Sequence, residues 1–326
     1  MPSAPDTGRP PVPAVTATGS RRSDRAERPG RLSVGVVGAG RVGTVLAAAL
    51  AEAGHRVVAA SAVSAASKDR AGALLPGVPL VPPQEVLDAA DLVLLTVPDD
   101  VLRDLVLGLV TTGAVRPGHL LVHTAGLLGT SVLDPATRLG ALPLALHPAM
   151  TFTGTSLDLG RLAGCVFGVT APDSLRPVAE ALVIEMGGDP VWVLEADRPL
   201  YHAALAHGSN HLVTLVAQAM DLLQAAAVRD PGHLLGPLLA AALDNVLRAG
   251  DAALTGPVSR GDAGTVTQHV RAVGAVSPEI LATYRALARA TADRALVAHR
   301  LAPEAAQALL GALAGPIDPG AQGGRP

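Results

Sequence analysis

The chain has 326 residues, of which 49% are hydrophobic and 16% charged, so it can bury the core of one large or two medium domains and is not a disordered chain. A formal net charge of −3 argues against a polyanion-binding protein. Aromatic residues make up only 2%, which argues against stacking surfaces for single-stranded nucleic acid. The one cysteine excludes an intramolecular disulfide and a multi-thiolate metal site.

Both ends of the chain have the composition of solvated tails. Residues 1–30 are rich in Pro, Ser, Thr and Arg, and residues 315–326 are rich in Gly and Pro. No purely apolar run is long enough for a membrane-spanning helix. We therefore expect a soluble, cytoplasmic protein with no membrane or nucleic-acid partner.

Between residues 31 and 195, short apolar runs alternate with helical patterns. The predicted strands are 32–37, 57–61, 78–81, 92–97, 120–123, 142–147, 166–170 and 191–194, and the predicted helices are 41–53, 64–75 and 172–186. Ser64 or Ser67 is the expected N-cap of the second helix. Continuous apolar strands separated by helices are typical of a parallel sheet covered on both faces. This pattern predicts an α/β, doubly wound, Rossmann-like domain.

From residue 196 the pattern changes to helices alone. They are expected over 197–228 with a break at Gly208, and over 234–249, 263–273, 277–299 and 303–313. Residues 254–262 read as a loop between two of them. We therefore predict an all-helical second domain over 196–314.

Gly38, Gly40 and Gly43 form a G-x-G-x-x-G motif directly after a predicted strand and at the start of a predicted helix. The first glycine permits a tight turn, the second lets a pyrophosphate approach the backbone, and the third lets helix and strand pack closely. The pyrophosphate would lie on the helix N-terminus, beside Arg41 and Val42. The alternative is a glycine-rich turn without a ligand.

The end of the second predicted strand favours NADP(H) over NAD. An NAD-selective site usually has an acidic residue there for the ribose hydroxyl, but residues 59–64 contain none. Ser61, Ser64, Lys68 and Arg70 are present instead, and hydroxyls and cations suit a 2′-phosphate. The alternative is that Lys68 and Arg70 are only exposed helix residues.

Further polar groups follow the later strands, where ligands of open α/β sheets bind. The residues expected to line the cofactor there are Thr96, Val97, Pro98 and Thr124. His147 ends the sixth predicted strand and is a candidate catalytic residue. His123 is expected to support the site from behind.

The first long helix of the second domain carries a polar patch on an otherwise apolar element. His202, Ser209 and Asn210 share one face at helical spacing, so a ligand or a hydrogen-bond network must satisfy them. A satisfied cluster between helices is the alternative. His207 and His211 have a metal-compatible spacing, but no third ligand is evident, so no metal is expected.

The segment Thr255-Gly-Pro-Val-Ser-Arg260-Gly-Asp262 combines several special residues in one predicted loop. Arg260 is suited to bind a substrate carboxylate with two parallel hydrogen bonds. Thr255 and Asp262 are candidates for substrate contacts. Asp262 is equally suited to cap the helix that follows.

The glycine motif, His147-Pro148, Ser209-Asn210 and the 255–262 segment together resemble a family in which a Rossmann-like domain is joined to a helical domain of unknown function. The resemblance covers residues 31–313. Its architecture is similar to the superfamily of pyrroline-5-carboxylate reductase, 6-phosphogluconate dehydrogenase and ketopantoate reductase. That likeness implies NADP(H) on the first domain and substrate between the domains, and some members of the family are thought to be alternative ketopantoate reductases.

One departure from these relatives concerns lysine. The usual ketopantoate reductases and β-hydroxyacid dehydrogenases carry a lysine on the interdomain helix, whereas the only lysine here is Lys68. If the chain is a reductase, a histidine such as His202 or His147, or a bound water, would have to donate the proton.

These observations predict an NADPH-dependent oxidoreductase that reduces a small carbonyl or imine compound bearing a carboxylate, with 2-dehydropantoate among the candidates. Asn210 would polarise the carbonyl group and Ser209 would contact the substrate. A non-catalytic NADP(H)-binding or sensing protein is the alternative. The long apolar helices predict a homodimer through the helical domain.

Overall fold

The computed structural model describes residues 30–315, and the chain divides into two compact units, of which one ends at Tyr201 and the other begins at His202. The tails predicted over 1–30 and 315–326 lie outside the described residues, apart from Gly30 and Gly315. None of the described helices is long and apolar enough to cross a membrane.

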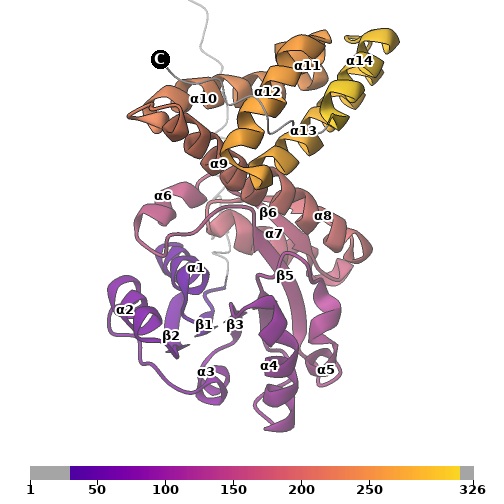
Figure 1. The fold of residues 1–326 in the computed structure, drawn as a ribbon. Coiled ribbons are helices and arrows are strands. Elements are labelled where there is room, and N and C mark those ends of the chain that lie inside the picture. Colours follow the sequence, from indigo (N-terminus) through magenta and orange to yellow (C-terminus); the bar gives the residue numbers. More distant parts are fainter. Residues whose placement is uncertain (1–29, 316–326) are drawn as a thin grey trace, which may run out of the picture. The chain divides into compact units, whose positions relative to one another are not determined.

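The first unit is built on one seven-stranded sheet with the order β2-β1-β3-β4-β5-β6-β7 (Figure 1). The strands are β1 (Ser33–Val37), β2 (Arg56–Ser61), β3 (Leu92–Leu95), β4 (Leu120–His123), β5 (Leu142–Pro148), β6 (Val166–Thr170) and β7 (Asp189–Trp192). The helices are α1 (Arg41–Glu52), α2 (Ala65–Leu74), α3 (Pro83–Ala89), α4 (Asp99–Thr111), α5 (Asp134–Thr137), α6 (Leu157–Leu162) and α7 (Arg176–Glu185). The doubly wound α/β prediction is confirmed.

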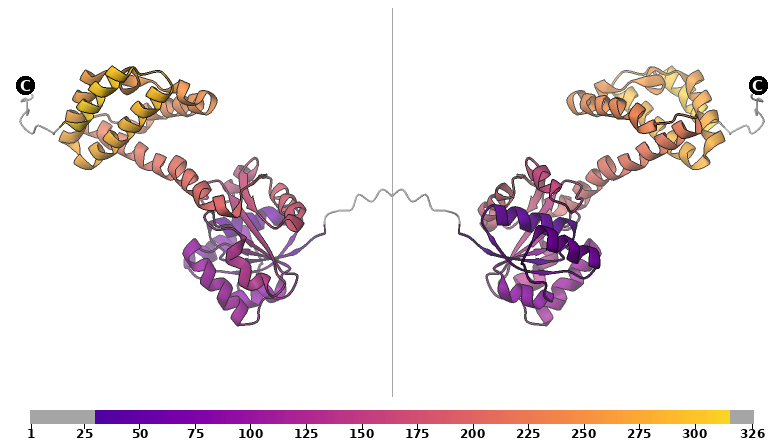
Figure 2. Two further views of the ribbon diagram at one scale, coloured as in Figure 1. Left: turned by 90° about the vertical axis from the view of Figure 1, so that its right-hand side faces the viewer. Right: turned by 90° about the vertical axis from the view of Figure 1, so that its left-hand side faces the viewer.

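Helices cover both faces of the sheet (Figures 1 and 2). Side chains of a strand alternate between the faces, so in β1 Val34 and Val36 join one core layer and Val37 the other. The first layer packs against α1 and α7, and the second against α3 and α4. Because β1, β3, β4 and β5 are parallel, their carboxyl ends meet at one edge of the sheet.

Two strand predictions need correction. The strand predicted over 78–81 is a single bridge between Ala60 and Leu80, because Pro79 has no N–H to donate and Pro82 ends the segment. The sheet is not wholly parallel, since β6 runs antiparallel to β5. An apolar run buried on both faces has the same pattern in either direction, so the sequence could not distinguish them.

The second unit consists of helices, as predicted. α8 (Arg198–Leu205) begins in the first unit and continues into a π-helical turn over Ala206–Asn210. The helices that follow are α9 (His211–Ala225), α10 (Pro231–Ala249), α11 (Gly256–Arg260), α12 (Ala263–Val276), α13 (Pro278–Val297) and α14 (Pro303–Ala314). Residues 254–262, predicted as a loop, thus contain the short helix α11, which has Pro257 in its first turn.

Apolar side chains are exposed on two helices of the second unit. α9 has no buried residue, and α10 buries only Pro231 and Leu235. Leu238 and Leu247 of α10 are 62% and 78% exposed. The homodimer predicted from these helices stays a prediction.

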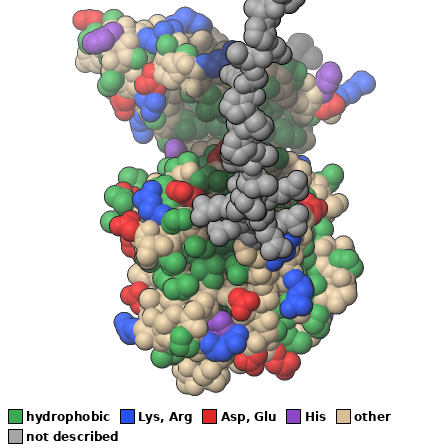
Figure 3. All heavy atoms as spheres, turned by 180° about the vertical axis from the view of Figure 1, so that it is seen from behind, with side chains coloured by type: hydrophobic (Ala, Val, Ile, Leu, Met, Phe, Trp, Pro, Cys, Tyr) green, Lys and Arg blue, Asp and Glu red, His purple; other side chains and the backbone are tan. Residues whose placement is uncertain are grey.

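On the face drawn in Figure 3, acidic and basic side chains of the first unit lie scattered among hydrophobic ones.

Arg198, the first residue of α8, is fully buried against the carboxyl-terminal edge of the sheet. Its guanidinium donates to the carbonyl oxygens of Ala145 (3.0 Å), Gly168 (2.9 Å) and Ala125 (3.2 Å), and to Thr170 Oγ1 (2.8 Å). These acceptors belong to β5, β6 and the segment after β4. One side chain therefore fixes the start of α8 to three neighbouring parts of the sheet.

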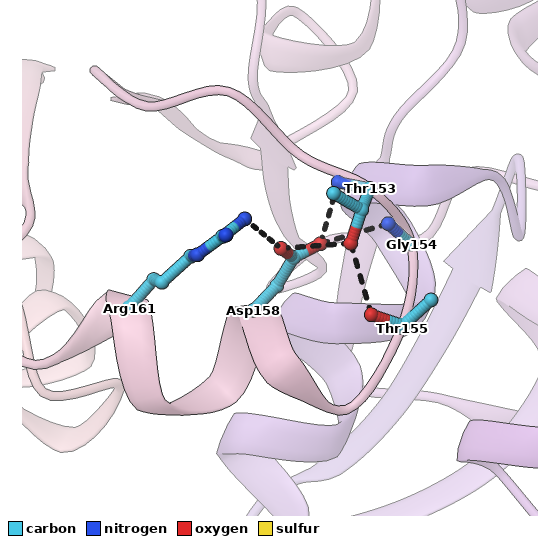
Figure 4. Close-up of polar contacts among 5 residues, drawn as sticks. All are labelled: Thr153, Gly154, Thr155, Asp158 and Arg161. Carbon is cyan, nitrogen blue, oxygen red and sulfur yellow. Dashed lines mark hydrogen bonds and ion pairs between the residues drawn. The ribbon is translucent and has the colours of Figure 1, made fainter. Parts of the chain in front are cut away.

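Asp158 fixes the segment between β5 and β6 in a similar way (Figure 4). Its buried carboxylate accepts hydrogen bonds from the N–H groups of Thr153 and Gly154, both at 2.7 Å, and from Thr153 Oγ1 at 3.0 Å. Burial alone would raise the pKa of Asp158, but hydrogen bonds from Gly154 and Thr153 outweigh it, so the pKa lies below its usual value. Gly154 is held in the left-handed region, at φ +78°.

Replacing Arg198 with Met should reduce the free energy of unfolding by about 3–5 kcal/mol, because four buried acceptors lose their charged donor. Denaturant unfolding of the purified variant measures this. Arg248→Met is the control, since Arg248 is exposed and pairs only with Asp244 on its own helix. Equal losses in the two variants would contradict the role of Arg198.

Asp158→Asn should cost about 2 kcal/mol at neutral pH, because the charge-assisted hydrogen bonds to Thr153 and Gly154 weaken. Since folding lowers the pKa of Asp158, its contribution is complete above the pKa of the unfolded chain and is lost as pH falls through the folded-state value. Unfolding measured across acidic pH should therefore show the wild type and variant converging. Asp104→Asn, at an exposed position of α4, should show no such pattern.

Candidate functional site

Two of the three motif glycines are tightly packed, and the third faces open space. Gly38 has φ +96°, and a Cβ there would lie 2.7 Å from the carbonyl oxygen of Thr96. At Gly43 a Cβ would overlap Thr96 Oγ1 and the Gly38 carbonyl oxygen. At Gly40 the nearest atom to an added Cβ is 3.9 Å away, so this side of the turn is open. Gly38 and Gly43 thus bring strand and helix together, and Gly40 leaves the backbone accessible.

The N-terminus of α1 offers backbone donors at this open turn. Gly40 is the N-cap residue, no side chain caps the helix, and its first turn has no acidic residue. The first N–H groups, including those of Arg41 and Val42, have no acceptor within the helix. Together with the helix dipole they favour an anion at this position.

Two cationic side chains meet beside this helix end. A Cβ added at Gly154 would lie 2.8 Å from Arg41 Cγ and 2.8 Å from Arg70 Cδ, so both arginines pass over this glycine. Within residues 30–315 neither guanidinium forms an ion pair. The Asp158 carboxylate holds Gly154 in place, and so it shapes the space between the two arginines. The sequence suggested both cations but gave no sign that they converge at residue 154.

The serines at the end of β2 have structural partners. The carbonyl oxygen of Ser61 accepts the N–H groups of Gly38 (3.2 Å) and Ala39 (2.8 Å). Ser64 is the N-cap of α2 and accepts the N–H of Ser67 at 3.1 Å, one of the two caps expected. No acidic residue stands at this end of the strand, as the sequence shows. Their contacts with a cofactor remain predictions.

Residues after β3 and β4 lie at the same edge. Thr96 Oγ1 donates to the Gly38 carbonyl oxygen at 2.7 Å and so supports the glycine turn. Val97 and Pro98 follow it, and Pro98 is the N-cap of α4. Thr124 follows β4 and is half-buried. These segments lie beside the glycine turn, where the sequence predicts the cofactor.

His123 has the supporting position expected of it. Its Nδ1 accepts the N–H of Ala125 at 3.2 Å, and its Nε2 lies 2.9 Å from the Gly129 carbonyl oxygen. Burial lowers the pKa of His123 to about 4, so the ring is neutral at physiological pH. It therefore holds the 124–129 segment.

His147 is paired with a residue that the sequence did not single out. Its Nδ1 lies 2.9 Å from the hydroxyl of Tyr201 on α8, with the two rings edge to face. Gly168 of β6, opposite His147 in the sheet, makes room for this ring, since a Cβ at residue 168 would overlap the Tyr201 hydroxyl. A neighbouring glycine on another strand cannot be recognised from the local sequence, which explains the omission.

The predicted polar patch of the second unit lies on and around the π-helical turn. Ser209 and Asn210 are in the turn and exposed, and His202 lies in α8 before it. The spacing used to align them assumed a regular helix, whereas the segment contains a π turn, so the shared face stays a prediction. π turns are frequent at functional sites. His207 and His211 lie side by side and exposed, and no metal-binding group is found among the described residues.

Arg260 lines a hollow of about 410 Å³ in the second unit. Thr255 and Ser259 line it as well, together with His299 and Arg300 from the end of α13 and the segment beyond it. Within the described chain the Arg260 guanidinium has no ion pair. Asp262 instead caps α12, accepting the N–H of Thr265 at 3.0 Å. His299 and Arg300 were missed because they are distant in sequence.

Two family models match the sequence. A Rossmann-like domain matches residues 18–148, and a domain of unknown function, DUF2520, matches residues 165–291. No curated protein sequence matches the chain.

Solved structures share the fold over most of its length. A candidate NADP oxidoreductase of Bacteroides fragilis is 21% identical, with a TM-score of 0.66 over 81% of this chain and 98% of its own. A protein of Thermotoga maritima is 18% identical, with a TM-score of 0.64 over 80% and 99%. An imine reductase of Myxococcus stipitatus, solved with NADP+, is 18% identical, with a TM-score of 0.57 over 82% and 94%. The two sequence matches show that the chain joins a Rossmann-like domain to a DUF2520 domain, as the resemblance predicted.

Proposed function

We propose that the protein is an NADP(H)-dependent oxidoreductase acting on a small carbonyl or imine compound. The observation that carries the proposal is the open turn at Gly40 on an uncapped helix N-terminus, with Arg41 and Arg70 converging beside it. These groups fit a dinucleotide with an additional phosphate. The similar structures with oxidoreductase names, one of them solved with NADP+, support the same chemistry.

Different groups of the first unit suit different parts of such a cofactor. The N–H groups of α1 suit the pyrophosphate, because the helix dipole and the unpaired donors both favour negative charge. Arg41 and Arg70 suit a 2′-phosphate, and no carboxylate at the end of β2 opposes it. When bound, a reduced nicotinamide supplies a hydride to the substrate.

The second unit offers groups for the substrate. Arg260 and Arg300 line one hollow with Thr255 and suit a carboxylate, since guanidinium binds planar anions with parallel hydrogen bonds. Asn210 is the proposed group that polarises the carbonyl or imine, with Ser209 beside it. The substrate class is therefore a 2-oxo acid or a cyclic imino acid, and 2-dehydropantoate is the first compound to test.

A non-catalytic NADP(H)-binding protein is the second candidate. It is favoured by the absence of lysine from α8, the π-helical turn and α9, since the chain has Lys68 alone. The resemblance to ketopantoate reductases and β-hydroxyacid dehydrogenases implies a lysine on this part of the chain.

Turnover separates the two candidates. Purified protein should oxidise NADPH in the presence of 2-oxo acids or imino acids, 2-dehydropantoate first, as followed by the loss of nicotinamide absorbance. Each acid is paired with its methyl ester, which should have a higher KM because Arg260 loses its anion. Tight NADPH binding without oxidation across the panel would favour the binding protein, and absence of binding would contradict both.

Cofactor choice is tested with Arg70→Gln. NADPH affinity should fall by about tenfold to 100-fold, since a charge-assisted contact to the 2′-phosphate is lost, while NADH affinity changes little. Calorimetric titration with both reduced nucleotides measures this. Arg56→Gln is the control, because Arg56 lies at the amino end of the same strand that ends at Ser61. Equal losses for NADPH and NADH would contradict the proposed phosphate contact.

A further inference from the structure

Both tyrosines of the chain form hydrogen bonds with histidines, one pair in each unit. The Tyr201 hydroxyl lies 2.9 Å from His147 Nδ1, and the Tyr284 hydroxyl lies 2.9 Å from His269 Nδ1. The first pair differs in its position, because His147 is the penultimate residue of β5 at the carboxyl-terminal edge of the sheet. This edge is where open α/β sheets bind their ligands.

A permanent cation lies next to the first pair. The Arg198 guanidinium carbon is 5.8 Å from the centre of the Tyr201 ring. All of its hydrogen-bond acceptors are uncharged oxygens, and within residues 30–315 it forms no ion pair. The Glu195 carboxylate acts on this cation without forming an ion pair with it, and the cation favours the phenolate form of Tyr201.

We propose that Tyr201 donates the proton in the reduction, with His147 as the group that restores it. The inference rests on the proposed function, because it needs a substrate that accepts a hydride. The sequence led us to expect a histidine as the proton donor. In this proposal the donor is the Tyr201 phenol, and His147 returns a proton to it.

The proton balance is as follows. As the substrate carbon gains a hydride from the reduced nicotinamide, the carbonyl π bond breaks and its oxygen takes the Tyr201 hydroxyl proton. The phenolate then takes a proton from Nδ1 of protonated His147, and bulk water reprotonates the imidazole. The substrate is reduced to an alcohol, or an imine to an amine, and the nicotinamide is oxidised. His147 must carry hydrogen on Nδ1 for the phenol proton to point toward the substrate.

The electrostatics of the pair suit a donor that stays protonated until it is used. Burial raises the pKa of Tyr201, and Arg198 opposes that rise. The groups that face the phenol are His147 on β5, Arg198 on α8 and the Cys165 thiol before β6. The phenol is therefore uncharged at neutral pH, and its conjugate base has a cation beside it.

The first test compares Tyr201→Phe with Tyr284→Phe, which removes the equivalent hydroxyl from the other unit. In Tyr201→Phe, kcat should fall by about 10²- to 10⁴-fold, with KM and NADPH affinity nearly unchanged. The alkaline decline of kcat, caused by loss of the donor proton, should disappear in this variant. Tyr284→Phe should keep both kcat and the decline. A similar kcat in the two variants would overturn the inference while leaving the proposed function intact.

The second test needs no turnover. In the Tyr284→Phe background Tyr201 is the only tyrosine, so ultraviolet absorbance follows its ionisation alone. Adding His147→Leu should move that ionisation to higher pH by about one to two units, because the phenolate loses a donor. Unchanged ionisation would overturn the inference. A shift in a protein that shows no NADPH oxidation would instead confirm the coupled pair and contradict both its catalytic use and the proposed reductase.

Discussion

The arrangement of the carboxyl-terminal edge of the sheet depends on the buried guanidinium of Arg198. Its four hydrogen bonds join β5, β6, the segment after β4 and the start of α8. Desolvating a guanidinium is costly, so this position is stable only while every acceptor stays in place. The same bonds place Tyr201, three residues further along α8, against His147 and Gly168. Folding and the geometry of the proposed donor therefore depend on one side chain.

A second buried charge plays the corresponding part at the cofactor end. Asp158 lies in α6, and its hydrogen bonds to Thr153 and Gly154 fix the segment over which Arg41 and Arg70 pass. Within residues 30–315 neither arginine forms an ion pair, so their charge is available to an anion. Each end of the proposed site is thus shaped by a buried ion. Backbone groups are three of the four partners of Arg198 and two of the four partners of Asp158. Backbone acceptors and donors do not vary with sequence as side chains do, which makes such anchors insensitive to changes around them.

The local parts of the fold followed from the sequence, and the long-range contacts did not. Apolar runs located all seven strands and both ends of α1 within a few residues, because burial on both faces leaves a continuous pattern. Ser64 and Asp262 were recognisable as caps from their positions before helices. The direction of β6 was not, since pairing direction leaves no trace in a run such as Val166–Thr170. Gly208 indicated an interruption of the helix, but the sequence did not show that the interruption is a π-helical turn.

The same division applies to the site. Gly38, Gly40 and Gly43 were found because their chemistry and spacing are local, whereas Tyr201 gains its significance from residues 33 and 54 positions away in the chain. The site also lacks the lysine that the resemblance implies, since Lys68 is the only lysine of the chain. A lysine acid would combine the cation and the proton in one side chain, whereas here a fixed arginine supplies the charge and a phenol holds the proton. Arginine stays charged at any working pH and cannot act as the acid itself, so the proton must come from a neighbour. In the proposed mechanism the charge and the proton therefore lie on two side chains, Arg198 and Tyr201, where a lysine would combine them.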